Sequence, residues 1–330
     1  MARYILRRCL DAAVLLVVTL GVTFVLVQLA PGDPSSRYIG GDIDPAAAAR
    51  IRRNLGLDDP VPVQFVRWSA SVARGDFGRS FVTGLPVRDS LATALPRTLW
   101  LTGVAFLVQI LAGLLLGVPA AGRSGLAARV PTVIALVFYS LPAFCLAYLL
   151  IGVFSLHLGW LPIGGLETPG AGTSSLIDRM RHLILPAGTL ALSGAAGWAR
   201  YARGAVSDVL SEHHITALRA RGAGPGLIRW KHGLRGALPQ LITLAGVSVP
   251  YLIGGAVVVE KVFAWPGIGS LVVDAIAARD YPVVLAVNLI AAMAVVIASL
   301  AVDLSCGWLD PRTILASDPA DGVAGRGSGQ

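Results

Sequence analysis

TLWLTGVAFLVQILAGLLLGVPA, residues 98–120, is the stretch that decides the fold. It contains no charged residue and exceeds the roughly 20 apolar residues that a helix needs to cross the hydrocarbon core of a bilayer. Its apolar residues are continuous and do not alternate with polar ones, as they would in a strand of a membrane barrel. A helix satisfies its own backbone hydrogen bonds in lipid, so the stretch predicts a transmembrane helix.

Further apolar runs of similar character lie on both sides of this stretch. The run at 183–198 is the weakest, because Gly188, Gly194 and Gly197 dilute it. The chain of 330 residues is 55% hydrophobic and only 14% charged, with a mean hydropathy of +0.71. We therefore predict an all-α integral membrane protein with about six transmembrane helices. The runs besides 98–120 are 12–30, 131–156, 183–198, 241–259 and 283–303.

The arginines and lysines of the short loops predict the orientation. Arg3, Arg7 and Arg8 precede the first run, and seven basic residues lie between the fourth and fifth runs. The short loops on the opposite side carry few basic residues, so the positive-inside rule places both termini in the cytoplasm. The start of the chain resembles a secretory signal, but the later spans and the lack of a clear cleavage site favour an uncleaved anchor.

This orientation divides the chain into four parts. Residues 1–30 form the cytoplasmic N-terminus and first helix, and residues 31–97 form an extracytoplasmic segment. Residues 98–310 form a five-helix core that carries a long cytoplasmic loop at 200–238. The tail at 311–330 is rich in Gly, Ser and Asp with little apolar content, so we expect it to be disordered.

The sequence lacks the motifs of several function classes. There is no GxxxxGK[ST] phosphate loop and no HExxH, and the three cysteines lie far apart without a CxxC spacing. No catalytic, cofactor-binding or metal-binding residue is therefore predicted. The net charge of +8 reflects membrane topology rather than nucleic-acid binding, because the basic residues lie between apolar runs. An ion-coupled carrier usually keeps a carboxylate or histidine relay within its spans, and these runs lack one.

The run at 241–259 carries small residues and a proline. We expect Pro142 to break the third span and Pro250 to break the fifth. Small residues and a kink permit either close helix packing or a water-filled path lined by backbone carbonyls, and composition leaves both open. The candidates for the channel or gate are Ser248, Gly254, Gly255 and Asn288. The alternative role of Asn288, as of Gln109, is hydrogen bonding between helices.

The loop at 200–238 reads as two short helices joined by a glycine turn. Ser211 is the expected cap of a helix in which residues 212, 215, 216 and 219 share a face. Arg221 and Gly222 end that helix, with Gly222 in a left-handed conformation. A second helix over 227–238 ends at Pro239. The pattern fits a docking element, and it fits equally a basic loop that contacts anionic lipid.

Two segments of this loop carry a resemblance. ITALRARG at 215–222 and HGLRGA at 232–237 are similar to the EAA loop of binding-protein-dependent ABC importers, in the dipeptide, oligopeptide and nickel permease branch. Thr216, Leu218 and Gly236 depart from the usual pattern, which bears on individual contacts. Other matching motifs occur in order along the chain. They are PGDP at 31–34, LGLD at 55–58, GDFG at 75–78, WPGIG at 265–269, RDYP at 279–282 and DPR at 310–312.

The resemblance implies a type I ABC importer permease in the plasma (inner) membrane of a bacterium. It implies a non-catalytic subunit that works with a homologous second permease, two cytosolic ATP-binding subunits and an extracytoplasmic substrate-binding protein. The residues that it assigns to ATPase coupling are Glu212, Ile215, Thr216, Ala217, Arg219, Arg221 and Gly222. The expected substrate is a di- or oligopeptide. A nickel chelate or another small solute is the first alternative, and an ion-coupled carrier is the second.

Overall fold

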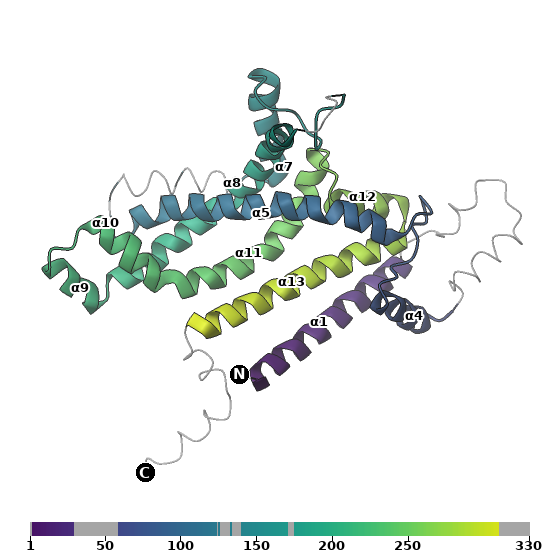
Figure 1. Cartoon of the computed structure of the whole chain (residues 1–330), viewed down its shortest axis with the longest axis horizontal. Helices are drawn as coiled ribbons and strands as arrows, with labels where there is room; N and C mark the ends of the chain where they lie inside the picture. Colours follow the sequence, from purple (N-terminus) through teal and green to yellow (C-terminus); the bar gives the residue numbers. More distant parts are fainter. Residues whose placement is uncertain are drawn as a thin grey trace, which may run out of the picture.

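The computed structural model describes residues 2–29, 59–123, 125, 133, 140–170 and 175–309. Throughout these residues the chain is built from helices and has no strand (Figure 1). The predicted tail at 311–330, the PGDP, LGLD and DPR motifs and most of the first half of the third span lie outside the described residues. The all-α class is therefore confirmed for the part of the chain that is described.

The helices begin with α1 (Ala2–Leu29), α4 (Val61–Ala73) and α5 (Val87–Ala120). α7 (Ala143–Leu150) continues into the π-helical η1 (Ile151–His157), and α8 (Leu176–Leu210) and the short α9 (His213–Ala220) follow. α10 (Pro225–Leu227), the π-helical η2 (Ile228–Gly233) and α11 (Leu234–Val262) run on without interruption, and α12 (Ile268–Ala278) and α13 (Tyr281–Leu309) complete the set.

Four helical stretches in the described residues are long and apolar enough to cross a membrane: Leu10–Val27, Val87–Ala120, Pro225–Val262 and Tyr281–Val302. Each of them covers most or all of one predicted run. α8 covers the weak run at 183–198 and has ample length, but its apolar content is diluted as expected. α5 begins at Val87 rather than at Thr98, so the helix extends into the segment predicted to lie outside.

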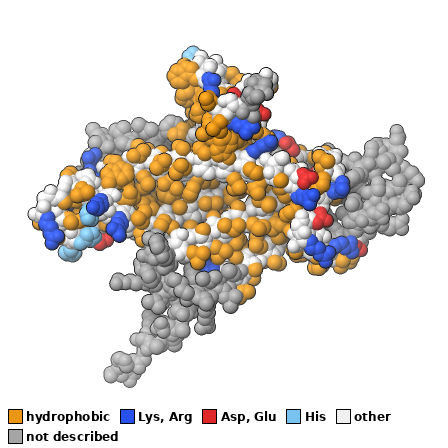
Figure 2. Space-filling view, viewed as in Figure 1, with side chains coloured by type: hydrophobic (Ala, Val, Ile, Leu, Met, Phe, Trp, Pro, Cys, Tyr) orange, Lys and Arg blue, Asp and Glu red, His pale blue; other side chains and the backbone are white. Residues whose placement is uncertain are grey.

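The surface of the molecule matches this membrane assignment. Figure 2 shows hydrophobic side chains across the middle of the elongated body, whereas Lys, Arg, Asp and Glu gather toward its two ends and around the part that projects at the top. Many large apolar side chains are exposed, such as Leu26, Leu115 and Ile297. An apolar band of this extent is what contact with lipid requires.

The closest helix packing joins α5 to α8. A Cβ atom added to Gly113 would lie 2.3 Å from Trp198 Cβ, and one added to Gly117 would lie 2.4 Å from the Ala199 carbonyl oxygen. Only glycine permits this approach of the two backbones, which is the way that small residues hold helices together in membranes. α11 then packs against α8 and α13, and α13 packs against α1.

The prolines of α11 do not break it, which corrects the prediction for Pro250 and the predicted helix end at Pro239. Both residues lie inside one continuous helix. Proline removes one backbone hydrogen bond, but neighbouring helices and local adjustments make this tolerable in membrane helices. Pro142, by contrast, precedes the first residue of α7 after a bend at Leu141, so the break predicted there is confirmed.

Candidate functional site

The predicted long loop at 200–238 is shorter than expected. α8 continues to Leu210, and helix resumes at Pro225, so the connection contracts to residues 211–224. Ser211 does not cap α9, because it ends α8 and its hydroxyl donates to the Asp208 carbonyl at 2.6 Å. Glu212 holds the N-cap position instead, without a side-chain cap. The predicted separate helix at 227–238 is wrong as well, since α10, η2 and α11 form one stretch.

α9 is attached to the body of the protein by its inner face. Ile215 is fully buried in an apolar cluster with Leu210 and Ile228, and the half-buried Leu218 packs against the same cluster. Ile215 therefore does not share one open face with Glu212, Thr216 and Arg219, as the sequence predicted. The remaining coupling candidates are exposed: Glu212, Thr216, Ala217, Arg219, Arg221 and Gly222.

The end of α9 follows the prediction. Gly222 has φ +79°, in the left-handed region, and its N–H donates to the Arg219 carbonyl at 3.0 Å. The Ala223 N–H donates to the Leu218 carbonyl at 3.1 Å. This pair of bonds, with Leu218 and Ala223 on the same apolar cluster, is the usual way in which glycine stops a helix. A Cβ at Gly222 would meet nothing within 4 Å, so only the backbone conformation demands glycine here.

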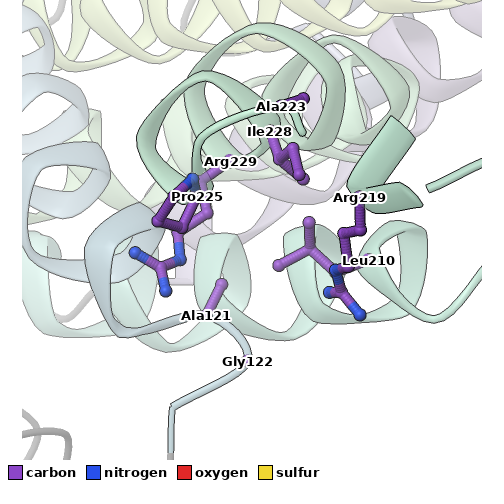
Figure 3. A pocket seen from close by; sticks show the side chains of 8 residues that line it. All are labelled: Ala121, Gly122, Leu210, Arg219, Ala223, Pro225, Ile228 and Arg229. Atoms are coloured by element: carbon purple, nitrogen blue, oxygen red, sulfur yellow. The ribbon is translucent and has the colours of Figure 1, made fainter. Parts of the chain in front are cut away.

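A pocket of about 200 Å³ lies between α9, the ends of α5 and α8, and η2. Figure 3 shows Arg219 and Arg229 beside this pocket, on different elements. Arg229 is one of the seven basic residues between the fourth and fifth runs, and the sequence predicts no further role for it. The lining residues are Ala121, Gly122, Leu210, Arg219, Ala223, Pro225, Ile228 and Arg229.

The four channel candidates do not gather on one face. Gly254 is exposed on α11, on the same side as Val247, Tyr251 and Val258, and Tyr251 is 79% exposed. A Cβ at Gly255 would instead lie 3.3 Å from Leu190 Cδ2 of α8. The other two candidates are half-buried: the Ser248 hydroxyl donates to the Leu244 carbonyl of its own helix at 2.8 Å, and Asn288 lies on α13.

At the other end of α11, a buried carboxylate connects α11 to α5 and to the start of α12. Glu260 is fully buried, and it accepts hydrogen bonds from the Thr98 hydroxyl at 2.6 Å, the Gly269 N–H at 2.8 Å and the Ser270 N–H at 3.0 Å. The Ile268 N–H donates to the Thr98 oxygen at 2.8 Å. The carboxylate and Thr98 thus satisfy the free N–H groups at the start of α12.

This role of Glu260, which directly follows the predicted fifth run at 241–259, was not predicted from the sequence. The sequence does contain a signal for this role, because an acidic residue precedes the two glycines of the WPGIG motif by only a few positions. A Cβ at Gly267 would lie 2.3 Å from Glu260 Oε1, so this glycine leaves room for the carboxylate.

Two further carboxylates join segments on the same side of the protein. Asp280 is buried before α13, and it accepts from the Ser80 hydroxyl and from the Phe81 N–H at 2.9 Å. Near the start of α8, the Thr168 N–H donates to Asp178 at 2.7 Å, and the Thr168 hydroxyl also donates to it. These bonds from Thr168 favour the charged form and lower the pKa of Asp178. Neither group has a metal-binding arrangement, and no cluster of three such ligands occurs in the described part of the chain.

These features define a class: a multi-pass helical membrane protein that carries a short, docked helix on one end. The chain belongs to the family described as "Binding-protein-dependent transport system inner membrane component", whose profile matches residues 109–315. The N-terminal profile of the same systems matches residues 1–102. The resemblance seen in the sequence is therefore confirmed.

Several transport permeases match nearly the whole chain. The oligopeptide transport system permease protein AppB of Bacillus subtilis is 39% identical over 315 residues, covering 94% of this chain and 99% of the relative. The glutathione transport system permease protein GsiC of Salmonella paratyphi A is 38% identical, covering 94% and 98%. A probable peptide ABC transporter permease protein of Sinorhizobium fredii, y4tP, is 39% identical, covering 94% and 99%.

The fold is shared with a solved ABC importer. A structure described as inward-facing MetNI methionine ABC transporter superposes with a TM-score of 0.53 and 23% identity, covering 67% of this chain and 96% of the matched chain. The predicted ABC importer permease architecture is thereby confirmed at the level of the fold.

Proposed function

We propose that this chain forms one half of the translocation channel of an ATP-driven importer of di- or oligopeptides. Its partners are a homologous second permease, two cytosolic ATP-binding subunits and an extracytoplasmic substrate-binding protein. The observation that carries the proposal is α9, which is fixed to the protein by Ile215 and presents Thr216, Ala217 and Arg219 outward. The relatives are named as transporters of oligopeptides, peptides and glutathione, which supports a peptide substrate.

The proposal also follows from what the sequence lacks. The chain has no phosphate loop for ATP, so the work of hydrolysis must reach it through a protein contact. A short helix whose inner face is packed transmits a displacement to the rest of the protein, which an unattached loop would absorb. α9 packs against η2, and Ile215 shares an apolar cluster with Leu210 at the end of α8, so a displacement of α9 acts directly on two helices of the core.

Reconstitution tests the proposal. The chain is co-purified with the second permease and both ATP-binding subunits, placed in proteoliposomes, and supplied with the binding protein and a labelled tripeptide. We expect uptake that requires ATP and stops when any component is omitted. Uptake by the chain alone, driven by an ion gradient, would contradict the proposal, and uptake of a nickel chelate but of no peptide would change the substrate class.

Gly222→Val tests the coupling role of α9. A side chain in the left-handed conformation costs roughly 1–2 kcal/mol, so we expect the end of α9 to shift and ATPase binding to weaken about 5- to 30-fold. Co-purification of the ATP-binding subunits measures this. Gly224→Val is the matched control, because Gly224 has φ −66° and open space around its Cβ position. Equal retention of the ATPase by both variants would assign α9 a merely connecting role.

Both termini are proposed to lie in the cytoplasm, on the side of α9. In Figure 1 the start of α1, the end of α13 and α9 lie toward one end of the molecule, while α4 and α12 lie toward the other. After replacement of the native cysteines, Ala70→Cys on α4 should react with an impermeant thiol reagent in intact cells, and Gly224→Cys should react only after lysis. Both positions are exposed. The reverse labelling would invert the topology.

We propose that the exposed face of α11 that carries Gly254 lines the translocation path or contacts the second permease. A Cβ at Gly254 meets nothing within 4 Å, so Gly254→Leu should leave this chain intact and at a normal level in the membrane, while transport falls at least about tenfold, corresponding to about 1.4 kcal/mol. Gly255→Leu should instead disturb the packing against Leu190 and lower the membrane level. Wild-type transport by Gly254→Leu would place the path elsewhere.

A further inference from the structure

The residues that lead into α5 form a tight turn at 80–85, which we call the 80–85 turn. The Ser80 N–H donates to the Leu85 carbonyl at 2.9 Å, and the Ser80 hydroxyl accepts from the Val82 N–H at 3.2 Å. That hydroxyl also donates to the buried carboxylate of Asp280, at the connection between α12 and α13. The turn is therefore held in one conformation and fixed to the body of the protein.

The 80–85 turn exposes two apolar side chains outside the membrane. Val82 is 53% exposed and Leu85 is 59% exposed. Residues 87–97 of α5, three of them charged, separate the turn from the uncharged run that begins at Thr98. These residues span about 17 Å along the helix axis, more than the roughly 5–8 Å of one lipid headgroup layer. Because lipid does not cover the turn, its apolar side chains are suited to contact another protein.

Arg279 lies next to this turn, in a backbone conformation that glycine usually takes. It ends α12 with φ +56°, and the Asp280 N–H donates to the Ala275 carbonyl at 2.8 Å, as in a helix end that normally carries glycine. A side chain in this conformation is unfavourable, and the charge at the end of the helix offsets only part of the cost. Such a residue at an exposed position points to a function outside the helix itself.

Two exposed guanidinium groups flank the turn. Arg79 precedes Ser80 as Arg279 precedes Asp280, so the hydrogen bond between Ser80 and Asp280 brings both arginines to one corner. Arg79 donates to a carbonyl oxygen of the turn at 3.0 Å. Neither arginine forms an ion pair with a described carboxylate.

The acids close to this corner are already engaged. Asp280 is buried in its bonds to the turn, Asp89 forms an ion pair with Arg88 at 3.3 Å, and Asp76 accepts from the Gly78 N–H at 2.9 Å. Guanidinium groups in this situation fit the carboxylates of a partner, to which they donate charge-assisted hydrogen bonds.

We propose that the 80–85 turn, with Arg79 and Arg279, is a docking surface for the extracytoplasmic substrate-binding protein. Val82 and Leu85 supply the apolar contact, and the two arginines pair with acidic side chains of that protein. A turn that is already fixed loses little conformational freedom on binding, which favours repeated docking. The inference rests on the proposed function, which supplies this partner and places the end with α4 and α12 outside the cell (Figure 1).

A binding measurement tests this surface. The complete importer, with the second permease and both ATP-binding subunits, is placed in phosphatidylcholine nanodiscs and titrated with the fluorescently labelled substrate-binding protein of the same transport system. Arg279→Asn removes the charge but keeps a residue that tolerates the left-handed conformation. We expect it to weaken binding about fivefold at about 50 mM salt and much less at about 500 mM, because salt screens exposed charges. Leu85→Ser should weaken binding about fivefold at both salt concentrations.

Arg67→Gln is the matched control, because it removes the same charge from an exposed position on α4, on the same side of the membrane. It should bind like the wild type, and a loss equal to that of Arg279→Asn would reduce the effect to general surface charge and overturn the proposal. Arg279→Gly should melt at or above the wild-type temperature and still bind weakly. Weak binding together with a lower melting temperature would give Arg279 a structural role instead.

The remaining outcomes identify what fails. Wild-type affinity of both Arg279→Asn and Leu85→Ser would overturn this inference and leave the proposed function standing. Loss of the second permease from the purified Leu85→Ser complex would identify that subunit as the occupant of the surface, which also overturns it. Absence of binding to the wild-type importer would contradict the proposed function, and the inference would fall with it.

Discussion

Ile215→Asp should release α9 from the protein and abolish ATP-driven uptake. Ile215 is fully buried in the cluster that contains Leu210 and Ile228, and it is the main apolar side chain that holds α9 in place. Losing this packing and burying a charge should cost at least about 3 kcal/mol at this contact. An isolated helix of eight residues is not stable in water, so an undocked α9 should also unfold.

Four measurements together separate this effect from general misfolding. The variant should reach the membrane at a near-normal level and keep the thermal unfolding of the helical core, while ATPase co-purification and peptide uptake are lost. His213→Asp is the matched control, because His213 is exposed on the first turn of α9, where an acid is favourable. Normal uptake by Ile215→Asp would show that the docking of α9 is not needed for coupling.

Glu260→Ala should destabilise the opposite side of the protein more than any surface change. The substitution leaves the Thr98 hydroxyl and the N–H groups of Gly269 and Ser270 without their acceptor. Each unsatisfied buried group costs about 1–3 kcal/mol, so the summed loss should reach at least about 3 kcal/mol. α12 loses the carboxylate at its N-terminus at the same time, which adds to the cost.

Thermal unfolding of the purified chain in detergent measures this loss. We expect the melting temperature to fall from wild type to Glu260→Gln and further to Glu260→Ala. Glutamine keeps one acceptor oxygen, but its NH₂ group cannot accept a hydrogen bond from the remaining donors. Lys261→Ala is the control: Lys261 is adjacent and exposed, and its ion pair with Asp274 is a surface pair worth at most about 1 kcal/mol. Equal melting temperatures for Glu260→Ala and Lys261→Ala would show that Glu260 has no structural role.

The parts of this fold that the sequence predicted are set by local chemistry. The run at 98–120 is apolar without interruption, so its helix did not depend on neighbours. Gly222 ends α9 because glycine alone takes the left-handed conformation without cost. The exposed outer face of α9 matches most of the predicted coupling residues, but their contact with an ATPase stays a prediction.

The parts that the sequence mispredicted depend on tertiary neighbours. Pro250 indicates a break only if nothing supports the helix around it, and α11 is packed on both α8 and α13. The glycines of α8 dilute its hydropathy, but a Cβ at Gly194 would lie 2.0 Å from Gln109 Oε1, so this position serves packing against α5. The sequence also could not predict that Arg219 and Arg229 lie beside the same pocket, because the turn between α9 and η2 brings them there.

The unbroken helical stretch from Pro225 to Val262 connects the α9 end of the molecule to the opposite end. Its 38 residues correspond to about 57 Å along the helix axis at the usual rise per residue. One end lies beside α9, and the other carries Glu260 and, through it, the start of α12. Because helical hydrogen bonding continues past both prolines, a displacement at the α9 end is passed along one continuous helix to Glu260, and through the hydrogen bonds of Glu260 to the start of α12.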